Sequence, residues 1–287
     1  MKKIFIIIAV FFLICTVFFL GLFFYEQNLI KQENELNEQL IDEFVITDTK
    51  KEETSTNTNT DVTTPSNTTE ETTPPTTEKP KPTYTPPKYT TPTDIDFASL
   101  KKKNSDVGGW VCLENSYINY PILMSEGNYY LRRNIYKQNA NQGCIFTYNN
   151  QKFETKEELD KNVILYGHNM KNGTMFTYLN TLLNNPNYLK TEKNKFIFLY
   201  TEHQIYKYEI YSVYKTEKTS NFNQVYFKDD NDFLSFCNTT NEKSVYKKSG
   251  INFDADGHVL TLATCANSNS QKYRTVLHAV LVETIEK

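Results

Sequence analysis

The chain has 287 residues, a formal net charge of −3 and 14% aromatic residues. Its lysines and arginines are interleaved with aspartates and glutamates, so no basic stripe supports binding to nucleic acid. The five cysteines are an odd number and too few for a disulfide framework in a chain this long. Because the sequence has no CxxC pair and no Cys/His spacing of a zinc site, we expect no metal and no cofactor.

The N-terminus has the composition of a membrane anchor. Lys2 and Lys3 precede an uncharged apolar run from Ile4 to Tyr25, which as a helix spans about 30 Å, the thickness of a bilayer core. A cleavable signal peptide is the alternative, but its small-x-small cleavage site is absent near residues 21–27. The leading lysines place the N-terminus in the cytoplasm. We therefore predict a single-pass protein of the cell membrane, anchored by residues 1–25 and extracytoplasmic beyond Tyr25.

Two polar segments follow the anchor. Residues 26–48 form a membrane-proximal segment with loosely spaced leucines, typical of a solvated extension of the membrane helix, although a short self-associating helix is also compatible. Residues 49–93 are rich in Thr, Pro, Glu, Asn and Lys and hold eight of the ten prolines. This composition buries too little apolar surface to offset its ordering entropy. We predict a disordered tether, at most about 140 Å long, that holds the globular part away from the membrane.

Residues 94–287 are sufficient for one domain with a substantial core. A helix is predicted at Ile95–Lys103, and Glu202 and His203 suit a hairpin turn. Runs rich in Val, Ile, Tyr and Phe predict eight strands, which favour a closed or nearly closed barrel. These runs are residues 109–113, 117–122, 143–147, 162–166, 195–201, 204–215, 259–264 and 275–283.

Two further helices are predicted between the strands. Thr174–Leu183 carries its apolar residues on one face. Asp230–Lys243 begins with aspartates that favour a helix N-terminus, and it lies in a long excursion that would be improbable without structure.

Two segments carry residues typical of catalysis. The sequence Tyr-Gly-His-Asn-Met, with His168 at its centre, follows an apolar strand, and Leu-Thr-Leu-Ala-Thr-Cys leads a second strand into the thiol of Cys265. Arg274 opens the last strand. Each residue alone has an ordinary structural interpretation. His168 could be a structural histidine with satisfied hydrogen bonds, Cys265 a buried thiol, and Arg274 a solvated residue at a strand edge. Together they fit acyl transfer, in which a thiol nucleophile needs a proton-transfer group and a donor for the developing oxyanion.

These motifs resemble the sortases. The TLATC sequence with an arginine nine residues later, and a histidine in an upstream YGHNMKNGTMF sequence, are similar to class B of that family. The resemblance covers residues 94–287. It implies a mainly β fold: an eight-stranded sortase-type β-barrel with an N-terminal helix and a helix inserted before the nucleophile strand. It also implies a membrane-bound cysteine transpeptidase of Gram-positive bacteria, in the thiol protease class of hydrolases.

The resemblance also implies roles for individual residues. Cys265 attacks a backbone carbonyl of a sorting signal to form a thioacyl enzyme, His168 transfers protons, and Arg274 holds the substrate and stabilises the oxyanion. Asn128 and Thr264 are candidate substrate-binding residues. The expected partners are NPQTN-like or LPXTG-like sorting signals of surface proteins and an amine of a peptidoglycan precursor or cross-bridge, with no nucleic acid.

The chain departs from the class B pattern in two places. Residues 145–150 read IFTYNN, where the family tends to have an Asp and an Arg-Asn pair, and the loop Ala266–Lys272 lacks the acidic residue of many relatives. A carboxylate partner for the site is therefore in doubt. The other histidines, His203, His258 and His278, have structural interpretations, although His278 shares a strand face with Arg274.

Three alternatives remain at this stage. A secreted cysteine peptidase would only hydrolyse its substrate, but papain-like enzymes place Cys before His in the chain, the reverse of the order here. A pilin-polymerising sortase would use a lysine as the acceptor amine. A tethered surface-binding domain would fit the anchor and the Thr/Pro-rich segment, but it leaves the His168, Cys265 and Arg274 set unexplained.

Overall fold

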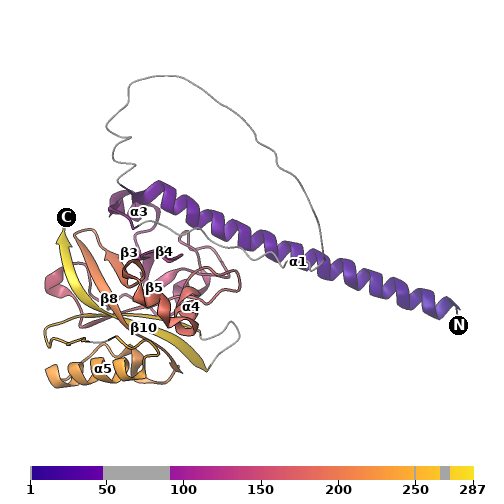
Figure 1. Ribbon diagram of the computed structural model, residues 1–287. Helices are drawn as coiled ribbons and strands as arrows, with labels where there is room; N and C mark the ends of the chain where they lie inside the picture. Colours follow the sequence, from indigo (N-terminus) through magenta and orange to yellow (C-terminus); the bar gives the residue numbers. More distant parts are fainter. Residues whose placement is uncertain (1, 48–90, 249, 266–271) are drawn as a thin grey trace, which may run out of the picture.

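The computed structural model describes residues 2–47, 91–248, 250–265 and 272–287 (Figure 1). Eight strands close into a barrel in the order β10-β8-β7-β3-β4-β5-β6-β9, which confirms the predicted barrel. The strands are β3 (Val107–Leu113), β4 (Asn119–Ser125), β5 (Ile145–Tyr148), β6 (Asn162–Tyr166), β7 (Phe196–Tyr200), β8 (Gln204–Glu217), β9 (Val259–Cys265) and β10 (Tyr273–Glu286).

Helices surround this barrel. The α-helices are α1 (Lys2–Phe44), α3 (Phe97–Lys103), α4 (Tyr178–Asn184) and α5 (Asp230–Lys243). Short 3-10 helices are η1 (Tyr129–Arg132), η2 (Lys156–Glu158), η3 (Pro186–Lys190), η4 (Glu192–Asn194) and η5 (Asn221–Asn223). The helix expected before the nucleophile strand is α5, which has the predicted bounds and lies along the barrel beside β10 in Figure 1.

Two predicted helices start later than expected, each for a local reason. Asp96 caps α3 by accepting a hydrogen bond from the backbone N–H of Ser99, so the helix starts at Phe97 and not at Ile95. The helix α4 starts at Tyr178 because the Thr177 hydroxyl is bound to both the N–H and the carbonyl of Met170, which keeps the preceding residues in a loop.

The helix α1 runs through both of the first two predicted segments. Its apolar first half projects from the domain in Figure 1 and has the length and composition to cross a membrane, a test that a signal sequence also passes. Its second half packs on the barrel, where Leu40 and Phe44 are buried against α3 and Trp110. The interpretation of residues 26–48 as a solvated extension is therefore wrong from Glu33 to Phe44, where the helix is docked. Buried Leu40 and Phe44, with partly buried Leu36, lie on the helical face that the loose spacing suggested.

A two-stranded sheet joins the ends of the Thr/Pro-rich segment. In it β1 (Val45–Ile46) pairs with β2 (Asp94–Ile95), with Val45 opposite Ile95. The predicted disorder of residues 49–93 lies outside the described residues, except for 91–93. Its proposed use as a spacer does not fit this pairing, because the chain leaves and returns at the same place. The docked half of α1, and not the length of the segment, sets the distance from the apolar half of α1 to the barrel.

His278 is a structural residue of β10. It is fully buried, and its Nδ1 lies 2.8 Å from the Thr261 hydroxyl, which itself donates to Asn162, while Nε2 accepts from the Tyr214 hydroxyl at 3.0 Å. The ring also packs edge-on against Phe236 of α5. Burial lowers the pKa of His278 to about 3, so the imidazole is neutral and has a partner at each nitrogen.

This burial predicts a loss of stability in acid. The folded-state pKa of His278 lies below the ordinary value. The stability that its neutral form gives the folded state is therefore complete above about pH 6.5 and is lost as the pH falls toward 3. Between pH 6.5 and 5 it should lower the free energy of unfolding by roughly 2 kcal/mol. Urea unfolding of the full chain in micelles, followed by the fluorescence of buried Trp110, measures this. His278→Gln should show a shallower decline than wild type, and equal slopes would contradict the assignment.

Candidate active site

Strand register brings three predicted site residues to one end of the barrel. β6 and β9 are parallel neighbours with Tyr166 opposite Ala263, and the N–H of Gly167 donates to the carbonyl of Ala263 at 3.2 Å. His168 follows Tyr166 by two residues, as Cys265 follows Ala263. The backbone of His168 is thus level with that of Cys265.

Arg274 completes the row on the other side. β9 and β10 are antiparallel, and the Cα partner of Cys265 is Arg274. Adjacent strands lie about 4.8 Å apart. The three backbones therefore occupy neighbouring positions at the ends of β6, β9 and β10.

The alternation of side chains places the three positions on one face. Leu260 and Leu262 of β9 belong to the barrel interior, whereas Ala263 packs outside it with Tyr166 and Val276. Along their strands, positions 265 and 274 are each two residues from a member of this outer set, Ala263 and Val276, and so fall on the outer face. Position 168 is two residues beyond Tyr166 and continues the same face of β6. The Cys265 side chain and loop residues 266–271 lie outside the described part of the structure, so the expected absence of a carboxylate there is not tested.

The His168 ring has a defined orientation. Its Nε2 lies 2.7 Å from the carbonyl oxygen of Leu131, and because a carbonyl only accepts, Nε2 carries the hydrogen and Nδ1 has the lone pair. Burial lowers the pKa of His168 below its usual value, the Leu131 contact opposes this, and the nearby charge of Arg132 adds to the lowering. The imidazole is therefore neutral at pH 7 and has one basic nitrogen.

Two glycines permit this orientation by close approach. A Cβ on Gly167 would lie 2.5 Å from Ile145 and 2.8 Å from Phe176. Gly143 has φ +58°, and a Cβ there would lie 2.4 Å from the carbonyl oxygen of Leu131, the atom that binds His168. Larger residues would displace the backbone on either side of the imidazole.

Arg274 and the two candidate substrate-binding residues differ in exposure. Arg274 is half-buried, and its Nη1 donates to the Tyr273 carbonyl at 3.0 Å. Asn128 is exposed, just before η1, the helix that carries Leu131. Thr264 is buried on the face opposite Cys265, which argues against a side-chain contact with substrate. The role of the Leu131 carbonyl has no sequence signal, because any residue supplies that group.

The other cysteines beyond Tyr25 are unsuited to nucleophilic attack. Cys112, Cys144 and Cys237 are buried, and burial raises the pKa of each thiol, that of Cys237 to about 12. A thiol with so high a pKa has almost no thiolate at neutral pH. The backbone of Cys265, in contrast, neighbours those of His168 and Arg274 through the register of β9 with β6 and β10.

Known proteins share this sequence and fold. A model of the sortase domain family matches residues 115–282. Sortase B of Staphylococcus aureus (strain NCTC 8325 / PS 47) is 32% identical over 183 residues, which cover 63% of this chain and 72% of that protein. Sortase B of Listeria monocytogenes serovar 1/2a is 33% identical over 190 residues, covering 65% and 74%.

Solved structures agree. The Staphylococcus aureus sortase B–substrate complex has a TM-score of 0.58 and 31% identity, covering 65% of this chain and 84% of that chain. Sortase B complexed with triglycine has the same TM-score and identity and covers 65% and 85%.

The barrel and these likenesses define an enzyme of the cysteine transpeptidase kind. The chain belongs to the sortase family, and within it to class B.

The cysteine environments predict a selective labelling pattern. A charged methanethiosulfonate added to the full chain in sealed vesicles should modify Cys265 roughly a hundredfold faster than Cys112, Cys144 or Cys237, whose thiols are buried. Peptide mass spectrometry of timed samples measures each site. Cys265→Ala should remove the fast phase; a fast phase that survives this substitution would show that another thiol is accessible.

Proposed function

We propose that this enzyme cleaves a C-terminal sorting signal through a thioacyl intermediate on Cys265 and transfers the acyl group to a cell-wall amine. The observation that carries the proposal is the strand register that makes His168, Cys265 and Arg274 neighbours. The existence of sortase B structures with a substrate and with triglycine, a peptide with a free amine, supports both halves of the reaction.

The proposed cycle transfers one acyl group and moves one proton in each of its two stages. Nδ1 of His168 takes the thiol proton, and the Cys265 sulfur attacks the peptide carbonyl of the signal. The tetrahedral intermediate collapses as the imidazolium gives its proton to the departing amine, which leaves a thioester. The incoming amine then attacks the thioester, His168 accepts its proton, and that proton returns to the released thiol. Arg274 would donate to the oxyanion in both stages.

The lowered pKa of His168 shapes this cycle. With a neutral imidazole and a thiol of ordinary pKa, the protonated thiol would be the resting form, and the reactive thiolate–imidazolium pair would be a minor fraction at pH 7. The Leu131 carbonyl would stabilise the imidazolium, because its partner Nε2–H becomes a stronger donor when the ring is charged.

The membrane arrangement is part of the proposal. Residues 1–25 would span the bilayer with the N-terminus in the cytoplasm, and residues 94–287 would form the extracytoplasmic catalytic domain. From Tyr25 to Asn34, where α1 meets the domain, the helix rises about 14 Å. Substrates would therefore react close to the membrane surface, where a lipid-borne precursor amine and a membrane-inserted sorting signal are both available.

The proposed roles predict a graded loss of activity. In the full chain, Cys265→Ala should abolish cleavage of a sorting-signal peptide, His168→Ala should lower kcat/KM by roughly 10²–10⁴-fold, and Arg274→Ala by roughly 10²–10³-fold. Peptide profiling by mass spectrometry measures cleavage and gives the preferred motif.

An added amine tests the second half-reaction. Triglycine should divert product from acid to amide in proportion to its concentration. Turnover in Cys265→Ala would contradict the nucleophile assignment. Product that stays entirely acid with every amine would favour a peptidase that only hydrolyses, and a preference for lysine would favour a pilin-polymerising enzyme.

A further inference from the structure

The docked half of α1 contacts both segments that hold His168. One is residues 128–144, here the bracing segment, which presents the Leu131 carbonyl to the imidazole. The other is residues 167–177, the histidine segment, which carries His168 itself. Both meet α1 at Glu33 and Asn34.

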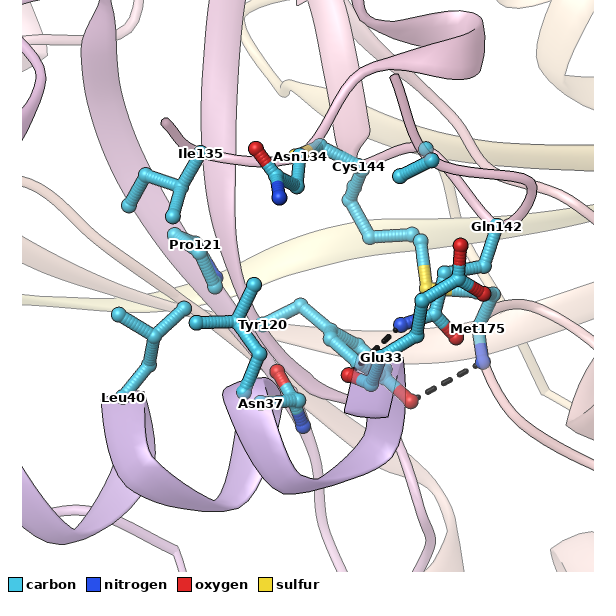
Figure 2. Close-up of a pocket in the computed structure, with 14 residues that line it drawn as sticks. Glu33, Asn37, Leu40, Tyr120, Pro121, Asn134, Ile135, Gln142, Cys144 and Met175 are labelled. Carbon is cyan, nitrogen blue, oxygen red and sulfur yellow. Dashed lines mark hydrogen bonds between the residues drawn. The ribbon is translucent and has the colours of Figure 1, made fainter. Parts of the chain in front are cut away.

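Glu33 binds the bracing segment through side chain and backbone. Its Oε1 accepts a hydrogen bond from the N–H of Asn141 at 2.6 Å, and its carbonyl accepts from Nε2 of Gln142 at 2.9 Å, the bond drawn in Figure 2. Glu33 is only 7% exposed. Glu33 fixes the backbone at Asn141, two residues before Gly143. The position of Asn141 therefore influences how the backbone at Gly143 passes close to Leu131.

The histidine segment is joined to the same point. Asn172 donates to Oδ1 of Asn34 at 3.4 Å, and the Thr174 hydroxyl donates to Asn172 at 2.8 Å and lies 3.4 Å from Oε1 of Gln142. Gln142 thus spans from Glu33 to Thr174. The segment that carries His168 and the segment that binds its Nε2 therefore share one attachment on α1.

The polar character of Glu33 is not explained by packing. It lines a small apolar cavity of about 40 Å³ with Leu36, Leu40 and Ile135, and burial raises the pKa of its carboxyl. Among the described residues, its Oε2 has no hydrogen-bond partner. A leucine would fill this cavity with no desolvation cost, but it could not accept the Asn141 N–H. The hydrogen bond to the bracing segment is what a glutamate supplies here.

We propose that Glu33 is a positioning residue for His168: by fixing the bracing segment it holds the Leu131 carbonyl against Nε2 and directs Nδ1 toward the thiol. The helix that would anchor the enzyme is then also part of its catalytic unit. This inference rests on the proposed function for its kinetic consequence, but its geometric core concerns His168 alone.

The test uses the full chain in nanodiscs with four substitutions. Glu33→Ala removes the acceptor, Glu33→Leu removes it while filling the cavity and retaining the docked helix, and Glu33→Gln keeps an acceptor oxygen. Glu35→Ala is the matched control, since Glu35 lies on the exposed side of the same helix and its ion pair in the described part of the chain is with Lys31 at 3.4 Å. The His168 resonance, assigned with His168→Gln, is titrated by NMR, and kcat and KM are measured separately.

Loss of the Leu131 contact should lower the His168 midpoint, because that contact raises its pKa. Glu33→Ala and Glu33→Leu should both show this, with kcat reduced roughly tenfold or more and KM for the peptide within about twofold. Glu33→Gln should restore both values, and Glu35→Ala should match wild type.

Two outcomes would overturn the proposal: wild-type titration and kcat in Glu33→Leu, or a Glu33→Gln variant as impaired as Glu33→Leu. If Glu33→Ala fails to fold, Glu33→Leu against Glu33→Gln decides the question. The titration needs no substrate. A wild-type enzyme that turns over no sorting peptide would therefore refute the proposed function, while the His168 midpoints would still decide the role of Glu33.

Discussion

The parallel pairing of β6 with β9 is the constraint on which the site depends. These strands are about a hundred residues apart in the chain, and their register, with Tyr166 opposite Ala263, alone brings a histidine on one level with a cysteine on the other. Parallel neighbours need a long crossover connection, and here α4, β7, β8 and α5 lie between β6 and β9 in the chain, with β7 and β8 forming part of the barrel itself. His278, Thr261 and Asn162 form a buried chain of hydrogen bonds across β10, β9 and β6. A shift of one residue would break that chain of hydrogen bonds and turn the face that carries the candidate site inward.

Sequence reasoning located most of this architecture because its signals are local. The β6 segment is a short apolar run bounded by Asn and Gly, and the aspartates before Phe233 marked the start of α5, so both elements were predicted with their observed bounds. The parallel register was not readable, since any pairing of two buried strands satisfies their composition. The His–Cys–Arg set was reached through the family resemblance. The role of the Leu131 carbonyl was not predicted, because every residue type supplies a backbone carbonyl and the sequence does not distinguish this one.

The docking of the second half of α1 on the barrel was not predicted, for a different reason. Residues 26–44 are polar on average, and only a narrow set of apolar residues meets the barrel, so the segment resembles a solvated helix. Closing the 47 residues between Ile46 and Asp94 into a loop costs on the order of 3 kcal/mol. Burial of Leu40 and Phe44, at about 1.5–3 kcal/mol each, offsets this cost. A long Thr/Pro-rich insertion is therefore compatible with a helix fixed on the barrel, and composition alone cannot distinguish a tether from a closed loop.

The same docking gives the proton chemistry its mechanical support. Nε2 of His168 is hydrogen-bonded to the Leu131 carbonyl. The position in which residues 128–144 hold that carbonyl therefore sets the direction of Nδ1. Gly143 lets the backbone pass close to it, and Glu33 holds the backbone just before Gly143. In the proposed cycle the imidazole gains and loses a proton twice, and a ring held this way would return to the same tautomer each time. Its geometry is thus set by hydrogen bonds that begin on a helix outside the barrel, and the barrel strands alone do not determine it.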